Sequence, residues 1–164
     1  MDEPVGRITG WPLKLRIIFS SIGIFVGVSV FIVFSTHYKN YNTGLWALVS
    51  GLAAAIALGV TIAYHKRAWD SNPMCLKSFM LLGCFIQLAG VCGLVAYLVL
   101  GITKQDGLVI YGTDYYLTCV WCFMTWKWGL GILLYSRSFL RSYTERGRLL
   151  NDDAEIAKKA YNIR

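Results

Sequence analysis

Cys119 and Cys122 form a C-x-x-C pair, the spacing with which thiol oxidoreductases make and break a disulfide. A four-span membrane enzyme of that kind also needs a second, shuttling pair of cysteines in an external loop. The links expected to be external, 37–44 and 104–114, contain no cysteine. Redox chemistry therefore stays an alternative, and the simpler interpretation is that both cysteines are small helix-packing residues.

Lys127 is the one charged residue within the otherwise apolar stretch 115–136. An unpaired ammonium at the centre of a bilayer costs at least ~2.5 kcal/mol, so this side chain is expected to face protein, water or a ligand. Gln87 is expected at a similar depth on a neighbouring helix. The sequence leaves open whether Lys127 lines a transport path, pairs with Gln87 or a helix carbonyl, or extends to the interface.

Several aromatic and imidazole side chains lie near the expected membrane surfaces. His37 and Tyr111 fall in the two external links, and Tyr64 and His65 end the second apolar run. Imidazole and phenolate are axial ligands of ferric heme, and flat aromatic faces suit a porphyrin. His37, Tyr64 and Tyr111 are accordingly the candidate ligands of a heme iron, although interfacial aromatics commonly serve only as membrane anchors.

Phe139, Arg141 and Tyr143 follow the last apolar run. If the helix continues through them, Phe139 and Tyr143 are four residues apart and share one face. Arg141 offers a planar cation that pairs well with a carboxylate, such as a heme propionate. The spacing alone is weak evidence, because an arginine and two aromatics after a span often only anchor it.

The elements that position these residues are four long apolar runs, at 17–36, 45–64, 78–103 and 115–136. Each has about the ~20 residues that a transmembrane helix requires. The 164-residue chain has a mean hydropathy of +0.51, more apolar surface than a soluble domain of this size can bury. We therefore predict an all-α membrane protein with four transmembrane helices, and the clustering of its positive charge argues against nucleic acid as a partner.

Basic residues predict the orientation, because lysine and arginine are retained on the cytosolic side. Thirteen of the sixteen lie before the first run, between the second and third, or after the fourth. This predicts a cytosolic segment 1–16, a transmembrane domain 17–136 and a cytosolic tail 137–164, with both termini in the cytosol. Glu145, Leu149 and Leu150 of the tail fit an acidic dileucine signal for endosomes and lysosomes, although a plain membrane-proximal helix also explains them.

The last third of the chain resembles the heme-responsive-gene family of four-span heme transporters. The resemblance rests on these residues: Tyr115, Tyr116, Leu117, Val120, Trp121, Phe123, Lys127, Trp128, Tyr135, Phe139, Arg141 and Tyr143. It implies a transporter, not an enzyme, that moves heme as its substrate from outside the cell or from an endolysosomal lumen into the cytosol. It also implies residence in the endosomal, lysosomal or plasma membrane and, for heme, a part in iron homeostasis.

The resemblance further implies a heme relay. The family's aromatic-Arg-Tyr tail motif falls on Phe139, Arg141 and Tyr143. Its second-span ligand position, counted back from Trp69, falls near Thr61, with Tyr64 one turn later and His65 beyond it. The family's external-loop histidine is absent between 104 and 114, where Tyr111 is the nearest replacement.

Two other functions remain as alternatives to heme transport. One is the membrane thiol oxidoreductase that would use Cys119 and Cys122, and the other is a ligand-free tetraspan scaffold or trafficking protein. The sequence also leaves open a homo-oligomer, because with only four helices a heme path can lie between subunits.

Overall fold

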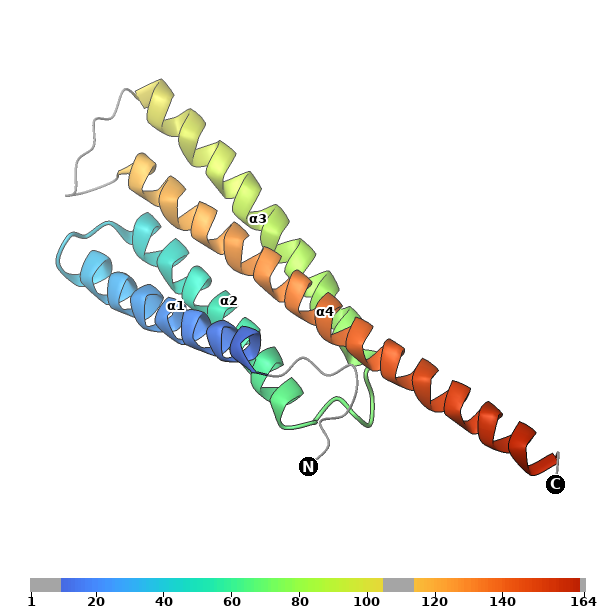
Figure 1. Cartoon of the computed structure of the whole chain (residues 1–164). Helices are drawn as coiled ribbons and strands as arrows, with labels where there is room; N and C mark the ends of the chain where they lie inside the picture. The colour runs from blue at the N-terminus through green and yellow to red at the C-terminus, as the bar shows by residue number, and fades with distance from the viewer. Residues whose placement is uncertain (1–9, 105–113, 163–164) are drawn as a thin grey trace.

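A computed structural model describes residues 10–104 and 114–162, and it contains four long helices (Figure 1). They are α1 (Trp11–Thr36), α2 (Tyr41–His65), α3 (Cys75–Lys104) and α4 (Tyr115–Asn162). All four are long and apolar enough to cross a membrane. The prediction of an all-helical fold with four such helices is confirmed, and the chain is a multi-pass membrane protein.

Each helix is longer than the apolar run that predicted it. The first begins at Trp11, where Pro12 occupies the first turn and loses no internal hydrogen bond there. The fourth continues without a break through the predicted tail to Asn162. At 1.5 Å per residue α4 is about 70 Å long, more than twice the ~30 Å hydrocarbon core, so much of it must lie outside the bilayer.

Polar side chains define the starts of α2 and α4. The Oδ1 atom of Asn40 accepts a hydrogen bond from the backbone N–H of Thr43 at 3.2 Å. Asp114 does the same for α4, accepting from the N–H groups of Tyr116 and Leu117 at 2.9 and 3.3 Å. Such caps satisfy N–H groups that have no partner within the helix.

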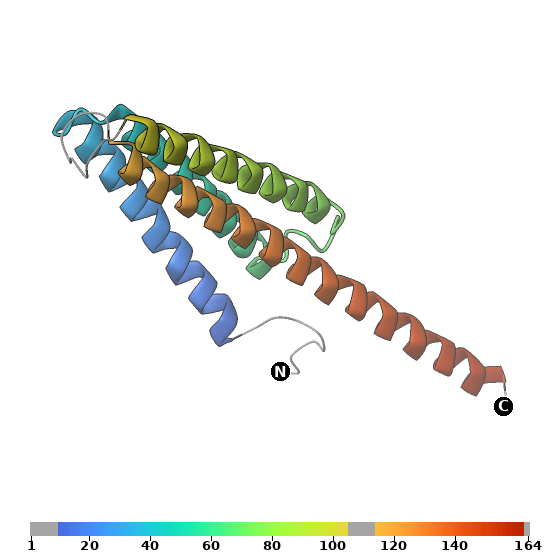
Figure 2. The ribbon, with the colours of Figure 1, turned by 90° about the horizontal axis from the view of Figure 1, so that it is seen from above.

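The helices run alternately up and down, and their neighbours in space are not simply their neighbours in sequence. α4 lies between α2 and α3, while α1 packs mainly on α2 (Figure 1). Figure 2 shows α1 inclined to the other three helices and the C-terminal part of α4 continuing well past their ends. The beginning of α1, the α2–α3 link and the C-terminal extension of α4 therefore share one end of the molecule, which we call the basic end.

Glycines allow the close helix contacts. An added Cβ at Gly27 of α1 would lie 2.7 Å from the Cα of Gly51 on α2. An added Cβ at Gly83 of α3 would lie 2.8 Å from the carbonyl oxygen of Gly129 on α4. These are the small-residue contacts expected of helices that associate in lipid. Large apolar side chains such as Phe25 and Phe85 point outward instead, at 74% and 61% exposure, as suits a lipid-facing surface.

Candidate functional site

One buried cluster receives a side chain from every helix, and it lies toward the basic end. Leu13 comes from α1, Val60 and Tyr64 from α2, Leu76 from α3 and Phe139 from α4. Trp69, Phe79, Tyr135 and Tyr143 are among the partly buried residues that pack around it. We call this set the aromatic cluster, and it contains three of the residues predicted to handle heme.

Tyr64 is at the centre of the aromatic cluster. Its ring stacks on Phe139 with centroids 4.0 Å apart and planes 11° from parallel, and the edge of Tyr143 meets it at 5.7 Å. The Tyr64 hydroxyl is 3.1 Å from the Oγ atom of Ser142, which in turn donates to the carbonyl oxygen of Phe139 at 2.8 Å. A tyrosine at 2% exposure with this partner is held firmly, so its phenol reaches a ligand only if the contact with Ser142 is given up.

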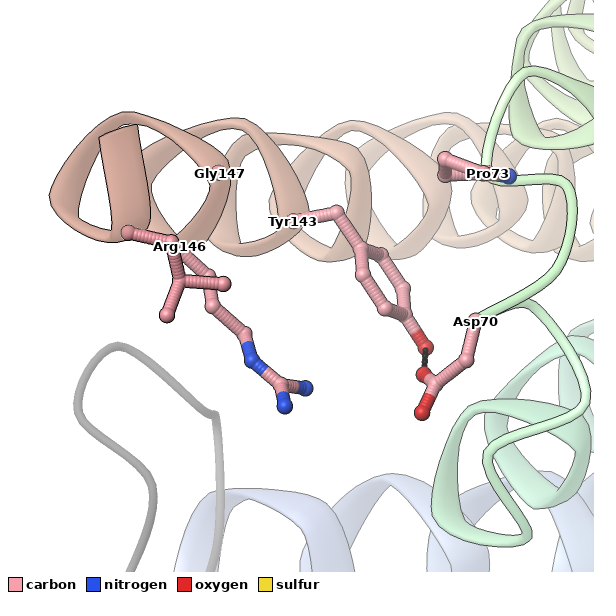
Figure 3. Close-up of a pocket in the computed structure, with 6 residues that line it drawn as sticks. Asp70, Pro73, Tyr143, Arg146 and Gly147 are labelled. Atoms are coloured by element: carbon pink, nitrogen blue, oxygen red, sulfur yellow. Dashed lines mark hydrogen bonds between the residues drawn. The ribbon is translucent and has the colours of Figure 1, made fainter. Parts of the chain in front are cut away.

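Tyr143 links the aromatic cluster to a surface pocket. Its hydroxyl donates to Oδ1 of Asp70 at 2.8 Å, which ties α4 to the α2–α3 link. Figure 3 shows both residues on one side of a pocket of about 280 Å³, with the guanidinium of Arg146 pointing into the same space. Pro73, Gly147 and Leu150 complete the lining. This pocket adjoins the predicted hand-off residues and is open to the surface.

Arg16 lies against the aromatic cluster, and sequence reasoning did not identify it as functional. Its guanidinium carbon lies 4.7 Å from the ring centre of Tyr135 and 5.1 Å from that of Phe139. Its Nη2 atom donates to Oγ of Ser138 at 3.5 Å. The only signal in the sequence was a lone arginine at the start of an apolar run, which the positive-inside rule already explained.

Arg141 lies on a different face of α4 from Phe139. The residue is exposed, while Phe139 and Ser142 on either side are buried. Two residues along an α-helix correspond to about 200°, so Arg141 faces away from the face that carries Phe139. The candidate signal residues Glu145, Leu149 and Leu150 are also exposed on the α4 extension.

The other second-helix candidates have contrasting surroundings. Thr61 is fully buried one turn before Tyr64, and its hydroxyl donates to the carbonyl oxygen of Ala57 at 2.8 Å. His65 is exposed at the end of α2. Trp69 folds back over this helix, donating from Nε1 to the Val60 carbonyl oxygen at 3.4 Å. The structure thus brings Tyr64 into the ring stack with Phe139.

His37 lies at the opposite end of the molecule from Tyr64. It follows α1 directly, is exposed, and meets the Tyr38 ring edge-on at 4.9 Å. The length of α2, roughly 35 Å at 1.5 Å per residue, separates the two side chains. They cannot bind one iron atom together, so any use of both requires two separate binding events. Tyr111, the other external candidate, is outside the described residues.

Lys127 is exposed on the outer side of α4, with Nζ 5.1 Å from the ring centre of Trp128. Among the described residues, Lys127 makes no hydrogen bond to Gln87, so the structure does not favour that alternative. The backbone N–H group and Cγ of Gln87 instead lie against Gly129. The charge therefore faces the surroundings of α4 and is stabilised, within the described residues, by an aromatic ring.

Cys119 and Cys122 are both buried and free. The thiol of Cys119 lies 3.7 Å from the carbonyl oxygen of Leu94, and Cys122 packs where Gly93 of α3 and Trp46 of α2 approach. These surroundings fit helix-packing residues. They give no observation that favours the redox alternative.

Two comparisons with known proteins agree with the expected resemblance. The family model described as "Haem-transporter, endosomal/lysosomal, haem-responsive gene" matches residues 76–128, a range that includes most of α3 and the first part of α4. The curated protein "Heme transporter hrg-1" of Caenorhabditis elegans is 26% identical over 144 residues, covering 84% of this chain and 73% of that relative. No solved structure matches the chain.

The segment that matches the family model does not contain most of the candidate site. Tyr64, Phe139, Arg141 and Tyr143 all lie outside residues 76–128. The roles proposed for these residues therefore do not rest on the family model. The match to the family model and the similarity to the nematode protein together confirm the resemblance of this chain to the heme-responsive-gene family of heme transporters.

Proposed function

We propose that this protein is a transporter that carries heme from the extracellular space or an endolysosomal lumen into the cytosol. Segments 1–16 and 137–164 are cytosolic in this proposal, and residues 17–136 form the transmembrane domain. The lysines and arginines that surround the basic end support this orientation. Heme is the cargo of the transporter and not a resident cofactor, and the protein is not an enzyme.

The observation that carries the proposal is the aromatic cluster at the basic end. Rings from α2 and α4 stack on each other and a guanidinium lies over one of them, so flat apolar groups and a cation are adjacent. Heme combines a flat apolar macrocycle with two carboxylates, so both parts of it have complementary groups here. The family match in α3 and α4 supports the same cargo.

The candidate residues then fall into an order along the membrane normal. His37 and Tyr111 receive heme at the external end, and Lys127 lies partway along α4. Tyr64, Phe139 and Tyr143 accept it at the basic end, where Arg141 faces outward for release. Because about 35 Å separates the two ends, heme changes ligands at least once on the way.

The first experiment tests Tyr64 as a ligand of the iron. Tyr64→Phe keeps the stacked ring and removes only the hydroxyl, so we expect it to weaken ferric heme binding and to change the Soret spectrum of the purified protein. Ser142→Ala keeps the phenol and removes its hydrogen-bond partner, so we expect the wild-type spectrum and equal or tighter binding. If both variants match wild type, or if heme only partitions into the detergent, Tyr64 is not a ligand.

A second experiment separates transport from the redox alternative. We expect the double variant Cys119→Ala/Cys122→Ala to support growth of a heme-auxotrophic cell at limiting heme as wild type does, because heme handling uses neither thiol. The effect on stability should be small, since alanine is close to cysteine in volume. Loss of growth with a normal protein level would favour thiol chemistry instead.

The same growth assay separates a transporter from a ligand-free scaffold. For Tyr64→Ala and Arg141→Ala, a transporter predicts poor growth at limiting heme and normal growth at high heme, with unchanged protein levels. A scaffold predicts growth like wild type at every heme concentration.

A further inference from the structure

Where α1 meets α4, one nitrogen of the Arg16 guanidinium is buried without a hydrogen-bond partner among the described residues. Four buried side-chain polar atoms lack a hydrogen bond among the described residues: Nη1 of Arg16, Oγ of Ser20, Nδ2 of Asn40 and Oγ of Ser136. Of these atoms, Nη1 of Arg16 belongs to the guanidinium that lies over the rings of Tyr135 and Phe139 on α4.

Arg16 is held in place by rings and not by acceptors. Tyr135 and Phe139 are four residues apart on one face of α4, and both rings lie within about 5 Å of the guanidinium. A guanidinium carries five N–H donors, whereas its one hydrogen bond here, to Ser138, is 3.5 Å long. Cation–π contacts fix the position of such a group and leave its in-plane donors available.

An oxyanion would supply the hydrogen-bond acceptors that the guanidinium donors lack. A carboxylate accepts two parallel hydrogen bonds from a guanidinium in a planar, bidentate geometry. Burying a donor without an acceptor is costly, so a native contact that retains such a guanidinium N–H is a site where a ligand gains affinity. Beside it the Tyr64 and Phe139 rings form a flat stack.

We propose that Arg16 binds a carboxylate of the cargo, using the contact between α1 and α4 as a carboxylate subsite of the aromatic cluster. This inference rests on the proposed heme transport and adds to it a residue on the first helix. Arg16 is the inner cation, next to the rings, while Arg141 is an outer one on the opposite face of α4. The phosphate of an anionic lipid offers the same chemistry, and the experiment distinguishes the two sources.

The test combines a change in the protein with a change in the ligand. Purified wild-type protein and Arg16→Gln are titrated with iron(III) protoporphyrin and with its dimethyl ester, in which both carboxylates are neutral. We expect wild type to bind the free acid about tenfold or more tightly than the ester, as a charge-assisted pair would produce. Arg16→Gln should lose most of this preference by binding the free acid more weakly, with little change for the ester.

Two further variants keep the result interpretable. Arg137→Gln removes an exposed arginine from the part of α4 that Arg16 contacts, and it should retain the wild-type preference for the free acid. Arg16→Lys keeps the charge without the planar fork, so it should restore part of the preference even if Arg16→Gln folds poorly. Thermal unfolding without heme identifies any variant that has lost its structure.

Other results would overturn the inference in distinguishable ways. Equal weakening of both ligands by Arg16→Gln would make Arg16 a purely structural residue. A preference unchanged by Arg16→Gln, together with thermal stabilisation by phosphatidylglycerol only when Arg16 is present, would assign the subsite to lipid phosphate. Saturable binding of neither ligand to wild type would contradict the proposed heme transport itself.

Discussion

Phe139→Ala is expected to destabilise the protein by about 3 kcal/mol or more, the usual cost of removing a fully buried phenylalanine side chain. Phe139 is completely buried, stacks on Tyr64 and supports the Arg16 guanidinium. Its removal leaves a cavity where all four helices meet. The change in the free energy of unfolding is measured by denaturant titration in detergent, with the helical circular dichroism signal as the readout.

The same substitution at Phe123 provides the matched control. Phe123 is on the same helix but is 49% exposed and contacts Trp126 at a centroid distance of 5.3 Å. Phe123→Ala should therefore cost well under half as much as Phe139→Ala. Phe139→Ala should also bind heme more weakly at denaturant concentrations too low to unfold it, because the flat stack is gone. If both variants lower the free energy of unfolding equally, Phe139 does not hold the central position in the packing that we assign to it.

Gly83→Ala is expected to cost about 1–3 kcal/mol, toward the upper end of the range for an overpacked site. The added methyl group would lie 2.8 Å from the carbonyl oxygen of Gly129 and 2.9 Å from the backbone nitrogen of Leu133. Backbone atoms of a helix cannot move aside as a flexible side chain can. The two helices must separate, which weakens one of the close contacts between α3 and α4.

Gly59→Ala is the control for the Gly83 variant. Nothing lies within 4 Å of a Cβ added at Gly59, so the same methyl group meets open space. Alanine also favours a helix over glycine, and we therefore expect stability equal to or slightly above that of wild type. A loss of stability in Gly59→Ala as large as in Gly83→Ala would mean that close packing of α3 and α4 is not what Gly83 contributes.

The four helices could be predicted from the sequence because membrane spanning depends on local composition. About twenty consecutive apolar residues are needed to cross the hydrocarbon core, and each of the four runs has them. The ends were less predictable, since a hydropathy sum detects the core-spanning part and not the helix beyond it. α4 extends to Asn162 because its charged continuation still consists of residues compatible with a helix.

Part of the aromatic cluster also followed from the sequence. Phe139 and Tyr143 were placed on one helical face by their spacing, and Tyr64 was marked as a ligand candidate by its chemistry. The structure brings these three rings together. Helical periodicity also separates Arg141 from Phe139, but only once it is known which face of α4 is buried.

What the sequence alone determined is therefore the number of helices, the basic end and the family resemblance, all of which depend on local composition or aligned motifs. The tertiary structure decided which residues from different helices contact one another. Arg16 and Ser138 are 122 positions apart, and no local pattern relates them. Lipid-facing and protein-facing positions are similarly apolar in α1 and α3, so hydropathy cannot show which faces pack. Small residues and close backbone contacts select the packed faces, and only that packing places Arg16 on the rings of α4.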